Sequence, residues 1–188
     1  MNTMQVAQRL TADEYLALET DWPRTWLVDG EVVVNQPRLL HQVLHGRLFG
    51  ALDGWVHAAD RRGLAVSPLD VLLDDRNVYA PDLLWYRADR APAIDADPPY
   101  PLPDIAVEIR SPSTWRYDIG TKKRVYEEQG LPELWLVDGD AAVVLAFRRS
   151  TPDAPRFDVA LELDRTATLS SPQLPGFALD VGALFESA

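Results

Sequence analysis

The chain has 188 residues, of which 47% are hydrophobic and 25% charged, an ordinary composition for a domain with a sizeable core. It contains no cysteine, which excludes disulfides, thiolate catalysis and cysteine-ligated zinc, and leaves oxygen ligands for magnesium, manganese or calcium. The net charge of −11 argues against broad, nonspecific affinity for nucleic acid, so any such contact requires a local basic patch. No segment approaches the ~20 apolar residues of a membrane span. We therefore expect a cytoplasmic protein with a single domain over residues 1–188.

The first part of the chain contains signals for two helices and a hairpin. Thr11-Ala-Asp-Glu14 is a capping box and predicts a short helix through Leu18. Asp29-Gly30 lies between two β-branched runs and predicts a two-residue hairpin turn. After Pro37, apolar residues recur at helical spacing as far as Val56, which predicts a long amphipathic helix packed against a sheet.

Strands are expected in the middle of the chain. Two long strands are predicted over residues 64–73 and 78–86, joined by a polar turn at 74–77. Residues 91–103 contain five prolines and predict a rigid surface connection with neither helix nor central strand. A buried strand then follows at 105–109.

The last part of the chain predicts a helix from about Asp118 to Gln129 that stops at Gly130, and then a hairpin over residues 134–147. The tail predicts a strand pair around residues 157–161 and Ala167, and a short helix after Asp180. Together these elements predict an α+β, sandwich-like fold. Its sheet is twisted, mixed and mostly antiparallel, is flanked by helices, and has hairpins near both ends of the chain.

Two of the apolar runs carry a carboxylate where a core strand normally has an apolar residue. Asp82 follows Pro81 inside the run 77–86, and Glu108 lies in the run 104–110. A buried, ionised carboxylate is unfavourable unless it is paired or binds a metal. Two such carboxylates on neighbouring strands, with cations close behind them, predict a divalent-metal site.

Cationic and phenolic side chains follow this pair of carboxylates. Strand alternation predicts that Glu108 and Arg110 project in the same direction. The next helix places Lys122 and Tyr126 on one face, four residues apart, with Asp118 one turn earlier.

These groups predict phosphodiester hydrolysis. A metal held by Asp82 and Glu108, together with the Ile109 carbonyl, would lower the pKa of a bound water and polarise a phosphoryl oxygen. The ammonium group of Lys122 would orient that water or stabilise the developing charge.

At these residues the chain resembles the PD-(D/E)xK nuclease superfamily, which has the restriction-endonuclease-like fold, and more closely the Uma branch of predicted endonucleases. The resemblance covers most of the chain in the expected order. It rests on Leu27-Val-Asp-Gly-Glu31, His41, Pro68-Leu-Asp-Val71, Ala80-Pro-Asp-Leu83, Pro103-Asp-Ile-Ala-Val-Glu-Ile-Arg-Ser-Pro-Ser-Thr114, Asp118-(x3)-Lys122-(x3)-Tyr126, Gly130-Leu-Pro-Glu-Leu-Trp-Leu-Val-Asp138 and Leu174-Pro-Gly-Phe177.

The resemblance implies a four-stranded core sheet flanked by helices, a bound Mg²⁺ (or Mn²⁺), and cleavage of DNA. It implies that Asp82 and Glu108 are metal ligands and catalytic residues. Lys122 would replace the lysine that the superfamily keeps two residues after the glutamate. Asp70 and His41 match positions that line the same cavity.

The chain departs from the family pattern at two positions. Arg110 occupies the superfamily's lysine position, where it can support charge but cannot act as a base. Trp26 stands in the hairpin strand where the branch often has an acidic residue. These departures and the net charge of −11 keep a second interpretation open, a catalytically weak or inactive nuclease-fold module that binds or regulates a partner.

Structural interpretations of the same residues also stay open. In this alternative, Glu108 and Arg110 are structural ions that pair with each other or with cross-strand neighbours. Lys122 and Asp118 have the spacing of a helical ion pair. His41 and His45 have a spacing that suits metal binding, yet hydrogen-bonded helix histidines are the simpler interpretation.

We also expect a homodimer, because enzymes that cut both DNA strands commonly present two sites by twofold symmetry. The hairpin over residues 134–147 is the predicted edge for pairing between subunits.

Overall fold

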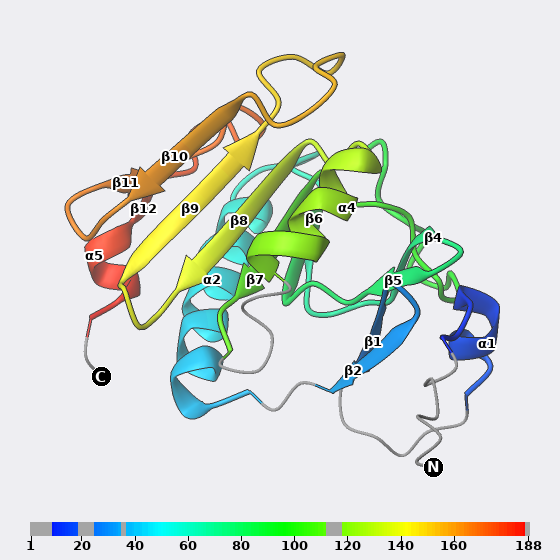
Figure 1. Ribbon diagram of the computed structural model, residues 1–188. Helices are drawn as coiled ribbons and strands as arrows, with labels where there is room; N and C mark the ends of the chain where they lie inside the picture. The colour runs from blue at the N-terminus through cyan, green and yellow to red at the C-terminus, as the bar shows by residue number, and fades with distance from the viewer. Residues whose placement is uncertain (1–8, 19–24, 35–36, 112–117, 187–188) are drawn as a thin grey trace, which may run out of the picture.

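The computed structural model describes residues 9–18, 25–34, 37–111 and 118–186 (Figure 1). The strands are β1 (Thr25–Val28), β2 (Glu31–Val34), β3 (Leu64–Val66), β4 (Val71–Asp74), β5 (Asn77–Tyr79), β6 (Leu83–Tyr86), β7 (Ile105–Ile109), β8 (Glu133–Asp138), β9 (Val143–Arg148), β10 (Val159–Leu163), β11 (Thr168–Leu169) and β12 (Leu179–Asp180). The helices are α1 (Ala12–Leu16), α2 (Leu39–His57), the π-helical turn η1 (Asp118–Lys122), α4 (Lys123–Glu128) and α5 (Val181–Leu184).

A six-stranded sheet with the order β10-β9-β8-β7-β6-β3 is the centre of the fold. Only the neighbours β7 and β8 are parallel in this sheet, and η1 and α4 lie between them in sequence as the crossover. A smaller sheet has the order β2-β1-β5-β4. The mixed, mostly antiparallel α+β fold is therefore confirmed, with six strands in the main sheet where the resemblance implied four.

The main sheet is covered on both faces. Helix α2 lies behind it in Figure 1 and α4 in front of it. Leu44, Leu48 and Leu52 of α2 pack with Val107 and Trp135 in one buried cluster. A second cluster, which includes Ala106, Val125 and Tyr126, fills the space between the other face, α4 and the small sheet. Strand β7 thus sends alternate side chains into two different layers, as its alternation predicted.

The two long strands predicted at 64–73 and 78–86 are wrong, because each run is divided between the two sheets. Strand β3 pairs with β6 in the main sheet, whereas β4 pairs with β5 in the small sheet. Pro68 and Pro81 lie at the two breaks. Proline has no N–H to donate to a ladder, so a strand is easily interrupted there. The breaks bring Asp70 and Asp82 to the place where the sheets diverge.

Several local predictions are confirmed. Asp29 and Gly30 have positive φ angles of 48° and 80°, which the two-residue turn between β1 and β2 requires. Thr11 and Glu14 form both hydrogen bonds of the capping box. Helix α4 ends before Gly130, which has a φ of 85°. Residues 91–103 contain no helix, and α5 follows Asp180.

Two predictions about the sheet edges are wrong. Strand β10 pairs with β9, while β11 pairs with β12, so the tail does not form the single strand pair expected around Ala167. The 134–147 hairpin is not an edge either, because β8 lies between β7 and β9 and β10 covers β9. Across the residues that the structure describes, none of the helices combines the length and apolar character of a membrane span.

Candidate functional site

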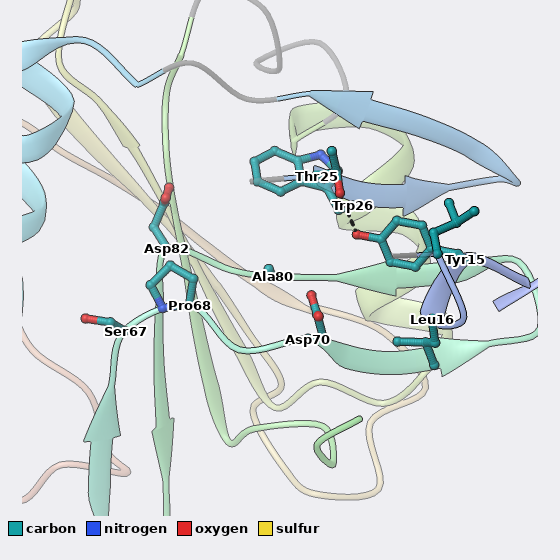
Figure 2. A pocket seen from close by; sticks show the side chains of 10 residues that line it. Tyr15, Leu16, Thr25, Trp26, Ser67, Pro68, Asp70, Ala80 and Asp82 are labelled. Atoms are coloured by element: carbon teal, nitrogen blue, oxygen red, sulfur yellow. Dashed lines mark hydrogen bonds between the residues drawn. The ribbon is translucent and has the colours of Figure 1, made fainter. Parts of the chain in front are cut away.

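A cleft of about 460 Å³ lies where the two sheets diverge. Asp70 and Asp82 line it from the two strand breaks, and Trp26 of β1 lines it from the opposite side (Figure 2). Tyr15 of α1 lies at its other end and hydrogen-bonds Thr25 over 3.0 Å. The described residues of this lining include the two aspartates but no arginine or lysine. Burial raises the pKa of Asp70 above its ordinary value.

Asp82 is held in place from two sides. Its Oδ2 accepts a hydrogen bond of 2.7 Å from the backbone N–H of Ile109 and one of 3.1 Å from His41 Nε2. His45, one turn further along α2, donates from Nε2 to the Asp82 carbonyl oxygen over 3.1 Å. The two histidines therefore fix the side chain and the backbone of Asp82, which is only 3% exposed. Their predicted role as hydrogen-bonded helix histidines agrees with this geometry.

Glu108 belongs to a buried ionic cluster next to Asp82. Lys122 Nζ lies 3.0 Å and 3.1 Å from the two carboxylate oxygens of Glu108, and 3.1 Å from Oδ1 of Asp118. Tyr126 donates its phenolic O–H to Oε1 of Glu108 over 2.8 Å. The indole ring of Trp26 covers this cluster on the cleft side, with its centroid 4.1 Å from Lys122 Nζ. The lysine side chain is fully buried.

Burial and charge set the protonation of this cluster. Burial raises the pKa of Glu108, and the neighbouring carboxylates Asp118 and Asp82 raise it further while Lys122 opposes them. Burial alone would lower the pKa of Lys122, but Asp118 and Glu108 outweigh it and hold that pKa above its ordinary value. Burial and Glu108 both raise the pKa of Tyr126. At neutral pH Lys122 and Tyr126 are therefore hydrogen-bond donors.

The donor chemistry of the site fits a hard divalent cation. Hydrogen bonds from described residues reach only one oxygen of Asp82, and Asp82 is near enough to Glu108 to shift its pKa. Magnesium typically uses one or two carboxylates and completes its octahedral shell with waters and substrate phosphates. No group of three histidines or carboxylates suitable for a metal occurs among the described residues. The chain thus offers two carboxylates, and Glu108 would exchange its contact with Lys122 for the ion.

The structure places Arg110 away from Glu108, so the prediction that they project in the same direction is wrong. Strand β7 ends at Ile109, and Arg110 Nη1 lies 2.8 Å and 2.9 Å from the two carboxylate oxygens of Asp138 at the end of β8. Arg110 lines a small pocket together with His41 of α2, on the other side of the sheet from Lys122.

Two members of the cluster were not assigned to the site from sequence. Asp118 was interpreted as a helical partner of Lys122 and as the first residue of a family motif, and neither interpretation gave it a role in the site. Trp26 was noted only as a departure from the family pattern, because nothing local indicates which cation its ring will cover. Residues 112–114 of the motif that begins at Pro103 lie outside the described residues.

Comparison with known proteins gives a consistent result. A search of the curated proteins found no match. Among solved structures, the chain is similar to a "putative nuclease belonging to DUF820" from Anabaena variabilis, with a TM-score of 0.78 and 20% sequence identity over 94% of this chain and 97% of that one. The model of the Uma2 family, described as "Putative restriction endonuclease", matches residues 12–182. This chain therefore belongs to the Uma2 family and has its restriction-endonuclease-like fold.

Proposed function

We propose that the protein is a divalent-metal-dependent endonuclease that hydrolyses phosphodiester bonds of DNA. Family membership supports a nuclease function. The geometry that supports it best is the convergence of Asp82, Glu108 and Lys122 beside one cleft. The Ile109 N–H links the end of β7 to Asp82 over 2.7 Å, while Glu108, one residue earlier, holds Lys122 over 3.0 Å.

Asp82 and Glu108 would hold Mg²⁺ or Mn²⁺. When bound, such an ion lowers the pKa of a ligand water and neutralises charge on a phosphoryl oxygen. Lys122 cannot act as a base at neutral pH, because its pKa is raised. Its ammonium group would instead orient the attacking water and stabilise charge that develops on the phosphate. His41 serves as a positioning residue, because it fixes the carboxylate of Asp82.

The test is cleavage of supercoiled plasmid and of single- and double-stranded oligonucleotides with Mg²⁺ or Mn²⁺. We expect Asp82→Asn and Glu108→Gln to abolish metal-dependent cleavage while the circular dichroism spectrum stays unchanged. Glu162→Gln on the edge strand β10 is the matched control, since Glu162 is an exposed carboxylate remote from the cleft, and it should cut like wild type. Cleavage retained in both site variants would remove the assignment.

A second candidate function is a binding or regulatory module that kept the nuclease fold. The described lining of the cleft favours it, because two aspartates without arginine or lysine repel a polyanion. The burial of Lys122 under Trp26 also favours this second function. This module would bind a partner with the same affinity in the Glu108→Gln variant, with or without metal. A nuclease would lose both metal binding and cleavage.

We also propose a homodimer, because cleavage of both DNA strands calls for two sites related by a twofold axis. Light scattering coupled to size-exclusion chromatography measures the mass directly. A monomer of 21.0 kDa at all concentrations would end this proposal.

A further inference from the structure

Two neighbouring cavities lie at one end of the main sheet, away from the cleft that contains Asp82. The first, of about 640 Å³, lies where the start of β8 and the end of β9 meet, at the upper edge of the sheet in Figure 1. The second, of about 480 Å³, lies beside the end of α2. Arg87 and Gln173 line both cavities, so they are two parts of one surface, which we call the arginine groove.

Arginine dominates the charge of this groove. Its lining contains Arg61, Arg62, Arg87, Arg90, Arg148 and Arg149. Three carboxylates also belong to it, namely Asp89, Asp104 and Glu133. The excess of cations is local, because the whole chain has a net charge of −11. The planar guanidinium group binds phosphate through two hydrogen bonds at once, which makes such a cluster well suited to a phosphate backbone.

The arginines of the groove differ in how firmly the protein itself holds them. Arg90 donates to buried Asp104 over 2.6 Å, and Arg149 donates to the backbone carbonyl of Leu131 over 3.2 Å. The guanidinium group of Arg87 makes only longer contacts, of 3.4 Å and 3.6 Å, to two aspartates, and the side chain is 51% exposed. The side chain of Arg148 makes no ion pair or hydrogen bond with the described residues, although Arg148 lies opposite Glu133 in the register of β8 and β9.

Aromatic surface accompanies the charge. Trp55 of α2 lines the groove, and the guanidinium of Arg62 stacks over its ring with 4.6 Å to the centroid. Basic side chains interleaved with an aromatic ring are typical of surfaces that bind nucleic acid.

The groove is separate from the cleft. Asp82 precedes β6 and Arg87 follows it, so the strand separates them by about 17 Å at the usual rise per residue. Strand β7 likewise separates Asp104 of the groove, which precedes its first residue, from Glu108 of the buried cluster near its end. A ligand in the arginine groove therefore leaves the cleft open.

We propose that the arginine groove binds the phosphate backbone of nucleic acid, as a docking surface distinct from the cleavage cleft. It supplies the local basic patch that a chain of this net charge needs for any such contact. Binding to this groove does not require the chain to cut DNA, so it can be tested independently of the proposed nuclease function.

The test is fluorescence anisotropy of a labelled 20-base-pair duplex, without divalent metal, over a series of salt concentrations. The variant Arg61→Gln/Arg87→Gln/Arg148→Gln removes three cations whose guanidinium groups have no partner among the described residues closer than the 3.4 Å from Arg87 to Asp89. The matched control Arg9→Gln/Arg76→Gln/Arg124→Gln changes the net charge equally at positions near the small sheet. Urea unfolding of each variant checks that the fold is intact.

We expect the groove variant to bind at least about tenfold more weakly than wild type, and its slope of log K against log salt to fall by about 2 to 3. The control variant should stay within about threefold of wild type. No binding by wild type at low salt, or equal loss in the two variants, would overturn the proposal. The proposal would also be overturned if free dAMP or inorganic phosphate displaced the labelled duplex at concentrations as low as unlabelled duplex does. That result would assign the groove to a small phosphorylated ligand.

Discussion

Replacing Lys122 with methionine removes the cation that contacts Glu108 and Asp118 inside the protein. The change keeps the length of the side chain and the helix propensity of the position, so the loss of charge dominates. Lys122 is fully buried and makes three contacts of 3.0 to 3.1 Å with the two carboxylates. Removal of one partner from a buried ionic cluster destabilises a protein by about 3–5 kcal/mol, because the remaining charge is left without compensation. We expect a loss of this size near neutral pH.

The pH dependence of this loss identifies its cause. Burial raises the pKa of Glu108 to about 8 in wild type, and Lys122 opposes this shift. Without Lys122 the folded pKa of Glu108 rises further, so the variant still holds this proton at a pH where wild type loses it. The difference in stability from wild type should therefore grow by up to about 1.4 kcal/mol per pH unit as the pH rises above about 8.

Urea unfolding followed by tryptophan fluorescence at pH 7, 8 and 9 measures this free energy. Lys123→Met is the matched control, because Lys123 is the next residue and faces the ring of Phe147 at 4.6 Å, outside the cluster. The control should lose less than about 1 kcal/mol, independently of pH. A loss for Lys122→Met below about 1 kcal/mol, or one that does not change with pH, would refute the assignment of a buried ionic cluster.

Two further predictions concern the residues around the cluster. His41→Ala should weaken Mn²⁺ binding about 10- to 100-fold in calorimetry, because it releases the carboxylate of Asp82. His41→Gln should restore part of the affinity through its amide N–H. Unchanged affinity in His41→Ala would contradict this positioning role. In urea unfolding, Trp26→Leu should have a free energy of unfolding about 1–2 kcal/mol lower than Trp26→Phe, since only the phenyl ring keeps an aromatic face over Lys122. Equal stability of the two variants would show that the ring contact contributes nothing.

Local signals in the sequence predicted most elements of this fold. The Asp29-Gly30 turn, the apolar periodicity of α2 and the stop at Gly130 depend only on neighbouring residues, and each appears in the structure. The breaks at Pro68 and Pro81 were missed because the apolar runs continue through them. Each of the two apolar runs is divided between the sheets, and the sheet that each part joins is decided by strands far along the chain. No local sequence pattern indicates those strands.

The candidate site was predictable in part for the same reason. Sequence placed Lys122 and Tyr126 on one helical face, and the structure brings both to Glu108. It could not place Arg110, because the strand ends at Ile109 and the pairing with Asp138 depends on the parallel register of β7 and β8. The cover that Trp26 forms over Lys122 likewise depends on how the two sheets meet.

The most direct test of the proposed metal site is a calorimetric titration of Mg²⁺ and Mn²⁺ into wild type and the Glu108→Gln variant. Each titration is run alone and with an uncleavable phosphorothioate duplex, so that a site completed by DNA phosphates is also measured. Glutamine can still accept hydrogen bonds from Lys122 and Tyr126, so the variant should keep its fold. The proposal predicts binding to wild type in at least one of these conditions and its loss in the variant. Binding that is equal in both proteins, or absent from both with and without DNA, would contradict it.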